Sequence, residues 1–244
     1  MGVVFDAAFG DNLDDLLALS LLYQLDNRNE CRVAAMTTSK HNVASASLYE
    51  VYQKLYGARP TANGMATGDW GTASGPLLKA ACAGQETTVK TVLDTAEPPN
   101  LMRNYLQAYH DGNAVILCTG PTHNLSDLLA LRGAKAIVEA KVKTLWLAGT
   151  NPKPPEGWPT PVEIVTADMA KALQYRPAPE DFAWDEKHPA RQAIAANPQA
   201  ELNRAALLAV LWAVRGKNVA NPDGLLRELT TAKPIPRQRF RPPV

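Results

Sequence analysis

Short apolar runs alternate with helical patterns along the first half of this chain. Gly2–Phe5, Arg32–Met36 and Ala114–Cys118 are typical of buried parallel strands, and the last of them (AVILC) is apolar throughout. Apolar residues recur at helical spacing after the first two runs, in Leu13–Leu25 and Ser45–Tyr56. Strands that alternate with helices predict an α/β fold, in which helices cover both faces of a mostly parallel sheet.

The second half continues this alternation with shorter elements. We expect strands at Val142–Leu147 and Val162–Val165, and helices at Leu77–Ala83, Leu101–Tyr109, Asn124–Leu131, Asp168–Gln174, Pro189–Ala196 and Leu202–Val214. Thr61–Gly75 is rich in glycine and small residues, so we interpret it as a loop. The pattern predicts one domain over residues 1–232 and a proline- and arginine-rich tail, 233–244, that is extended or disordered.

An acidic turn follows the first strand and opens the first helix. It contains Asp6, Asp11, Asp14 and Asp15. Capping and the helix dipole account for one or two acidic residues at a helix start. Four exceed that need, so we interpret the turn as a functional acidic site.

Polar loops also follow two further strands of the predicted sheet. The three loops are Asp6–Asp15, Thr37–Asn42 and Thr119–Asn124. The carboxyl ends of neighbouring parallel strands open at one edge, where α/β proteins bind ligands. The loops therefore converge if their strands are neighbours.

Composition narrows the function classes. The 244 residues are 46% apolar and 20% charged with a net charge of +1, which favours one large domain and gives no sign of a nucleic-acid partner. No apolar run is long enough to span a membrane. No leader peptide is visible, but a chain from which a leader had been removed would look the same, so both a cytoplasmic and an exported protein are compatible with the sequence. The chain has no glycine-rich dinucleotide or nucleoside-triphosphate motif.

The segment FDAAFGDNLDDLLAL resembles the N-terminal signature of the inosine–uridine nucleoside hydrolases. That signature has a strand, Asp-x-Asp, a glycine and two adjacent aspartates at a helix start, which Asp6, Gly10 and the pair Asp14–Asp15 match in part. Three later segments resemble family motifs in the same order: Met36–Asn42, Cys118–Leu125 and Leu208–Gly216. The resemblance implies the open α/β fold of that family and hydrolysis of ribonucleoside N-glycosidic bonds.

The resemblance also implies a calcium ion that holds the ribose hydroxyls and the attacking water. By that likeness Asp15 is a metal ligand, Asp14 contacts ribose and the metal site, and the backbone carbonyl of His123 contacts the metal. Asn42 would hydrogen-bond the sugar, and Asp6 belongs to the catalytic turn. The expected partner is a small nucleoside or ribosyl ligand, and the family likeness implies a homo-oligomer.

Several positions depart from the family pattern. Ala8 and Ala206 stand where the family has metal-ligand aspartates, and Glu163 stands where it has an asparagine that grips ribose. Calcium needs about six to eight oxygen ligands, so we expect weak or absent calcium binding and lost or weakened hydrolysis unless Asp6, Asp11 or Glu163 substitutes.

Two further residues are candidates for the substrate site. His41 follows the second strand, and Trp70 lies in the glycine-rich loop where the family closes over substrate, although a surface turn explains Trp70 equally well. One alternative function is a non-catalytic relative that binds a nucleoside or sugar. The last alternative is a phosphatase with Asp6 as nucleophile. It too needs an aspartate where Ala8 stands.

Overall fold

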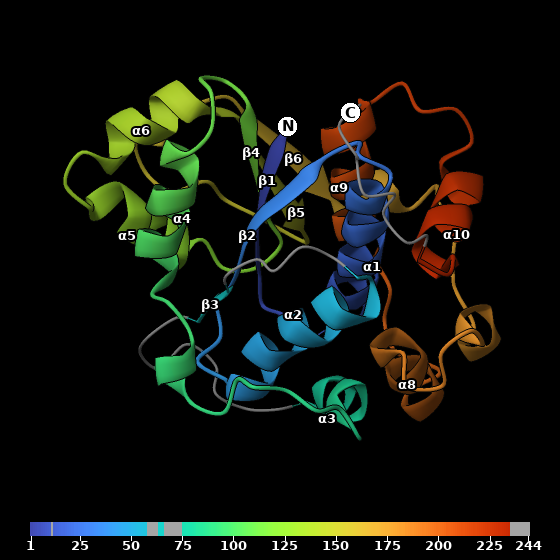
Figure 1. Cartoon of the computed structure of the whole chain (residues 1–244). Coiled ribbons are helices and arrows are strands. Elements are labelled where there is room, and N and C mark those ends of the chain that lie inside the picture. Colours follow the sequence, from blue (N-terminus) through green and yellow to red (C-terminus); the bar gives the residue numbers. More distant parts are fainter. Residues whose placement is uncertain (11, 58–62, 66–74, 235–244) are drawn as a thin grey trace, which may run out of the picture.

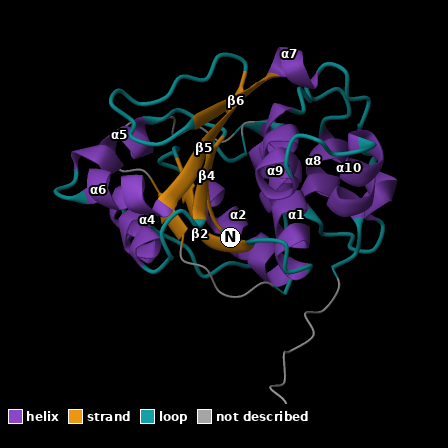
Figure 2. Ribbon diagram, turned by 90° about the horizontal axis from the view of Figure 1, so that it is seen from above, coloured by secondary structure: helices purple, strands orange, loops and turns teal. Residues whose placement is uncertain are grey.

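Six parallel strands form one sheet at the centre of the molecule (Figure 2). The computed structural model describes residues 1–10, 12–57, 63–65 and 75–234. The strand order is β3-β2-β1-β4-β5-β6, and each of these neighbouring pairs is parallel. The strands are β1 (Gly2–Ala7), β2 (Arg32–Thr38), β3 (Asn63–Met65), β4 (Ala114–Cys118), β5 (Val142–Gly149) and β6 (Val162–Thr166).

Helices cover both faces of the sheet, which confirms the predicted architecture (Figure 1). The apolar core on one side of the sheet includes residues of α1 (Leu13–Asn27), α2 (Val43–Leu55), α3 (Pro76–Cys82), α8 (Pro189–Ala196), α9 (Ala205–Arg215) and α10 (Pro222–Thr231). The other face packs against α4 (Pro98–Gln107), α5 (His123–Ala130) and α6 (Ala134–Lys141). Short helical segments occur at η1 (Val92–Asp94), α7 (Ala167–Ala170) and η2 (Pro179–Phe182).

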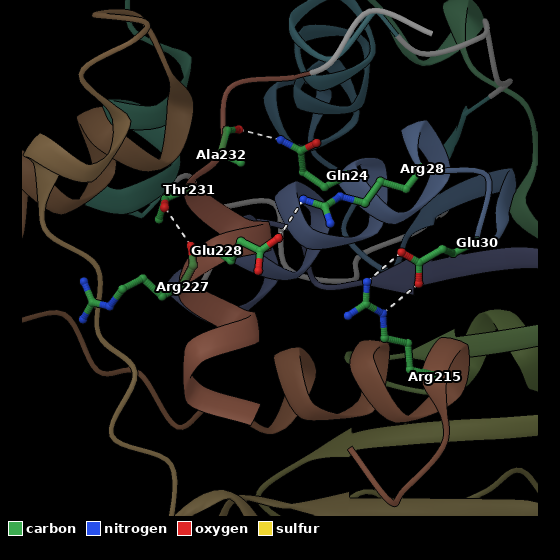
Figure 3. Close-up of polar contacts among 8 residues, drawn as sticks. All are labelled: Gln24, Arg28, Glu30, Arg215, Arg227, Glu228, Thr231 and Ala232. Carbon is green, nitrogen blue, oxygen red and sulfur yellow. Dashed lines mark hydrogen bonds and ion pairs between the residues drawn. The ribbon is translucent and has the colours of Figure 1, made fainter. Parts of the chain in front are cut away.

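Helix α1 lies inside the larger helical layer, in contact with α2, α8, α9 and α10. All 15 of its residues are buried, which explains why its apolar residues occur all around the helix. Ion pairs join the residues at the carboxyl end of α1 to α9 and α10 (Figure 3). Arg215 forms a two-pronged ion pair with Glu30, at 2.6 and 2.7 Å, and Arg28 contacts Glu228 at 3.0 Å. The carboxyl-terminal helices therefore enclose the helix that follows the acidic turn.

The structure corrects several predicted elements. Strand β3 lies inside the segment expected to be a loop, and α6 and α10 have no counterpart in the sequence prediction. The helix expected to end at Gln174 stops at Ala170, and α9 begins at Ala205 instead of Leu202. Arg204 has a φ of 66°, a left-handed conformation that separates the preceding loop from α9. Within the described ranges, no helix has both the length and the apolar character needed to cross a bilayer.

Candidate functional site

The three polar loops converge as expected, because β2, β1 and β4 are neighbours in the sheet. Asp6 near the end of β1 pairs in register with Thr37 of β2 and with Cys118 of β4. Strands β2 and β3 lie on one side of β1 in the sheet, and β4, β5 and β6 lie on its other side, so the strand order reverses between β1 and β4. Such a switch in strand order opens a crevice at the carboxyl ends of the strands, where α/β proteins bind ligands.

Asp6 is a buried residue that joins these strand ends through side-chain hydrogen bonds. Its side chain is fully buried, and its Oδ1 accepts hydrogen bonds from Thr37 Oγ1 at 2.6 Å and Asn124 Nδ2 at 2.8 Å. The Cys118 thiol lies 3.6 Å from the other carboxylate oxygen. Burial raises the pKa of Asp6 to about 6, and the three hydrogen bonds oppose that rise. Asp6 is therefore a buried link between β1, β2 and the start of α5.

The loop after β4 packs directly on the loop after β1. A Cβ atom at Gly120 would lie 2.6 Å from the backbone nitrogen of Ala8 and 2.7 Å from Ser39 Oγ. Only glycine permits so close an approach of the two backbones. This contact fixes the spacing of the two loops at the sheet edge.

Asp14 connects the start of α1 to the loop that precedes α9. Its two carboxylate oxygens accept hydrogen bonds from the backbone N–H groups of Asn203 (3.0 Å) and Arg204. The side chain is 3% exposed. Burial is the main reason why the pKa of Asp14 rises to about 6, and the charge of Glu201 adds to the rise while the two backbone donors oppose it.

A cleft of about 660 Å³ opens beside Asp14. That volume lies within the range of roughly 300–1,000 Å³ that is usual for small-molecule sites. Its lining combines carboxylate, carboxamide and apolar side chains: Asn12, Asp14, Pro76, Leu77, Thr150, Ala196, Asn197, Pro198, Gln199, Ala200, Glu201 and Asn203. A second cleft, of about 430 Å³, is formed by the loops after β4 and β5 and shares Thr150 with the first.

Two of the predicted site residues take part in helix capping. Asp15 is buried, and its backbone N–H donates to Asn12 Oδ1 at 2.8 Å while Asn12 Nδ2 donates to Asp15 Oδ2 at 3.2 Å. Asn42 caps α2, since its side-chain oxygen accepts from the backbone N–H groups of Ala44 (2.9 Å) and Ser45 (3.3 Å). Both side chains lie at loop-to-helix junctions on the site's edge of the sheet.

Of the predicted site residues that the structure describes, Asp14 alone lines the larger cleft. Glu163 lies on β6, the strand at the end of the sheet, and pairs with Lys217 at 2.7 Å. His123 is the first residue of α5 and is half-buried, and burial lowers its pKa. His41 is half-buried in the loop before α2, and Trp70 lies outside the described residues.

The calcium ligands that the family resemblance implies are only partly present among the described residues, and Asp11 lies outside them. No group of three or more His, Cys, Asp or Glu side chains in this part of the chain has a metal-binding arrangement. Ala8 and Ala206 contribute no side-chain oxygen, and both oxygens of Asp14 accept backbone hydrogen bonds. A hard cation needs about six to eight oxygen donors, so weak or absent calcium binding stays the prediction for this site.

Solved structures with the same fold include nucleoside hydrolases. The chain is similar to the purine-preferring ribonucleoside hydrolase from Gardnerella vaginalis, with 16% identity and a TM-score of 0.63 over 90% of this chain and 82% of that one. It is also similar to the effector protein XOO4466 (14% identity, TM-score 0.69, 96% and 94% covered). The type III effector protein XopQ, complexed with adenosine diphosphate ribose, has 14% identity and a TM-score of 0.63 over 96% and 93%. No protein-family model and no curated protein matches the chain. The likeness concerns the fold, a mostly parallel α/β sheet that matches nucleoside hydrolase structures.

Sequence reasoning missed the loop that forms most of the larger cleft, residues 196–203. Asn197, Glu201 and Asn203 have no periodic pattern around them, and their segment was expected to enter a helix at Leu202. The only signal was the concentration of Asn, Gln, Pro and Glu between two apolar helices, which is typical of a loop.

Proposed function

We propose that this protein is a nucleoside hydrolase-like protein that binds a nucleoside or another riboside in the cleft beside Asp14. We further propose that calcium-dependent hydrolysis of the N-glycosidic bond is lost or weakened. The observation that carries the proposal is the cleft of about 660 Å³ at the carboxyl end of the sheet, with Asp14 in its wall.

Two features support a ribosyl ligand. The lining of the cleft offers several carboxamides and a carboxylate, groups that can pair with sugar hydroxyls. In addition, XopQ, which shares this fold, was solved with adenosine diphosphate ribose. Asp14 is the cleft residue that we propose for contact with the ribose. The family resemblance adds Asn42, which caps α2 and lies outside the lining of the cleft.

The loss of two carboxylates supports weakened chemistry. A cation in such a site lowers the pKa of the attacking water, and a neighbouring aspartate removes its proton. The side chains of Ala8 and Ala206 can neither hold a cation nor accept a proton from water. Asp6 is fully buried, and its carboxylate accepts hydrogen bonds from Thr37 and Asn124. This burial also disfavours Asp6 as the nucleophile of a phosphatase, because a nucleophile must reach its substrate. A non-catalytic riboside-binding protein is therefore the second candidate, and Ala8 and Ala206 favour it.

Titration calorimetry with ribose, inosine and uridine tests the binding proposal. We expect saturable binding of at least one nucleoside, which Asp14→Ala weakens by at least tenfold. Hydrolysis of the same nucleosides, measured as release of free base with calcium and with a chelator, separates the two candidates. Slow hydrolysis that calcium does not accelerate supports weakened catalysis, and no release supports the binding protein. Rapid calcium-dependent hydrolysis would contradict the proposed loss, and absence of any binding would contradict the ligand class.

A further inference from the structure

A β-turn, residues 197–200 in the loop between α8 and α9, forms part of the wall of the larger cleft. The backbone N–H of Ala200 donates to the carbonyl oxygen of Asn197 at 3.0 Å and closes the turn, and Pro198 is its second residue. Proline is favoured at that place because its ring fixes φ at about −65°. All four residues of the turn line the cleft, so the position of the turn helps to set the shape of the cleft.

Arg176 binds this turn through the backbone of the turn. Its Nη2 atom donates to the carbonyl oxygens of Pro198 at 2.9 Å and of Ala200 at 2.8 Å. Arg176 is exposed and is not among the described residues that line the cleft. Hydrogen bonds from a charged donor are stronger than those between neutral groups. Arg176 therefore acts on the cleft through the two carbonyl groups that it binds.

Asp14 binds the other end of the same loop. Its carboxylate accepts hydrogen bonds from the backbone N–H groups of Asn203, at 3.0 Å, and of Arg204. Asp14 and Asn203 both line the cleft, so this attachment belongs to the proposed site. The loop is thus attached at two points, and Arg176 provides the one that lies outside the site.

The segment that carries Arg176 is itself anchored. Asp223, in the first turn of α10, accepts at Oδ1 from the backbone N–H groups of Gln174 at 2.8 Å and Tyr175 at 2.6 Å. The carbonyl oxygen of Tyr175 accepts from Arg204 Nε at 2.7 Å. A residue can position another group only if its own backbone is fixed, and these contacts meet that condition for Arg176.

We infer that Arg176 is a positioning residue of the riboside site, since its two hydrogen bonds fix the turn in the conformation that accepts the ligand. The inference rests on the proposed function and adds to it a residue that does not touch the ligand. Without these bonds the loop keeps its attachment at Asp14, but the turn gains conformational freedom. Binding must then order the turn, so riboside affinity falls although every side chain in the cleft is unchanged.

The variant Arg176→Met tests the inference, because methionine keeps an unbranched side chain and removes the donors. Calorimetric titration of the full chain with inosine and uridine should show binding about tenfold weaker than in the wild type, the effect of one hydrogen bond from a charged group. Arg176→Lys keeps a cationic donor and should recover at least about threefold of that loss. Arg132→Met, at an exposed arginine between α5 and α6, is the matched control and should leave the affinity unchanged.

Hydrogen–deuterium exchange of the ligand-free protein separates positioning from general destabilisation. In Arg176→Met the backbone amides of Ala200 and Asn203 should exchange about tenfold faster or more, because the hydrogen bonds that protect them lie in the released loop. The buried amides of β1 and β4 should keep their wild-type rates, and the melting temperature should change little. A merely structural role of Arg176 would instead reduce protection throughout the chain.

The outcomes separate this inference from the proposed function. If inosine or uridine binds equally well to the wild type and to Arg176→Met, the positioning role is wrong and the riboside site stands. Unchanged exchange at Ala200 and Asn203, or a lysine variant that binds no better than the methionine variant, would also overturn the inference. If neither nucleoside binds to the wild type, both the inference and the proposed function are wrong.

Discussion

Asp6 and Asn124, which are 118 residues apart in the sequence, share a hydrogen bond of 2.8 Å at the centre of the sheet edge. Asn124 also donates to the backbone oxygen of Thr38 at 3.3 Å, so one carboxamide joins the ends of β1 and β2 to the start of α5. The carboxylate that accepts this bond is fully buried and has no cation among its hydrogen-bond partners. Ionisation of the Asp6 carboxyl group therefore changes the stability of the three loops that follow β1, β2 and β4.

Replacement of Asp6 by asparagine should change how stability depends on pH. The pKa of Asp6 is raised to about 6 in the folded protein, so between about pH 6 and pH 4 the folded state holds a proton that the unfolded state has lost. Ionised Asp6 therefore lowers the free energy of unfolding at neutral pH by up to about 3 kcal/mol relative to its value below pH 4. Asp6→Asn keeps an oxygen to accept from Thr37 and Asn124, and it should remove this contribution.

Urea unfolding across this pH range measures the effect. The free energy of unfolding of Asp6→Asn minus that of the wild type should be greatest near neutral pH and should decrease on acidification. Since both proteins share all other titrating groups, this difference isolates Asp6. A difference that does not change with pH would show that the carboxyl group does not titrate as stated.

His188 should make the protein less stable as pH falls, which is the opposite of the effect of Asp6. Its Nδ1 accepts from the Ala190 N–H at 3.1 Å, so the neutral ring carries its proton on Nε2, 3.1 Å from the Tyr56 hydroxyl. Burial, here against Phe182 and other aromatic rings, lowers its pKa to about 3. The stability from the neutral ring is complete above the unfolded-state pKa of about 6.5 and is lost as pH falls toward 3, by about 5 kcal/mol in total.

The variant His188→Asn tests this prediction. Asparagine can cap α8 in the same way, through its side-chain oxygen, but it does not titrate and it loses the ring contacts. We expect a cost of about 2 kcal/mol or more at neutral pH. Its stability should then decrease less steeply than that of the wild type between pH 6.5 and 4. Equal slopes in the two proteins would mean that another group controls the acid response.

The sequence predicted the sheet and the convergence of three loops because both depend on local patterns. Apolar runs such as Ala114–Cys118 identify buried strands, and polar residues directly after them mark the carboxyl edge. The helix α6 has no counterpart in the prediction because three of its eight residues are charged and only Ala134 and Val138 are buried. Short amphipathic elements carry too little pattern to be recognised alone.

The cleft could not be predicted in the same way, since long-range contacts form it. Residues 196–203 have no regular pattern, and the hydrogen bonds from Asn203 and Arg204 to Asp14 span about 190 positions in the sequence. Glu163 was assigned to the site from the resemblance, and the structure places it beside Lys217. The pairing of a loop with a distant carboxylate follows from tertiary packing, which no local pattern encodes.

Gly120 should be intolerant of even a methyl group. The added Cβ of Gly120→Ala would lie 2.6 Å from the backbone nitrogen of Ala8, and backbone at that depth moves only at a cost. We expect a loss of about 2 kcal/mol or more in the free energy of unfolding, together with weaker riboside binding. Gly75→Ala is the matched control, because a Cβ there meets nothing within 4 Å and the φ of −67° suits alanine. Similar losses in both variants would contradict the close packing of the two loops.

Restoring the two missing carboxylates should create a response to calcium. The double variant Ala8→Asp, Ala206→Asp supplies the oxygen donors that the family pattern places at these positions, next to the Asp15 already present. Ala206 is 4% exposed in the first turn of α9, so an unpaired aspartate there should lower the melting temperature without metal. Millimolar calcium should reverse that loss in the double variant through preferential binding to the folded state, and it should leave the wild type unchanged. Adding Asp15→Asn to the double variant should abolish the calcium response. Stabilisation of the wild type by calcium, or a double variant that calcium does not stabilise, would show that these two positions do not control calcium binding.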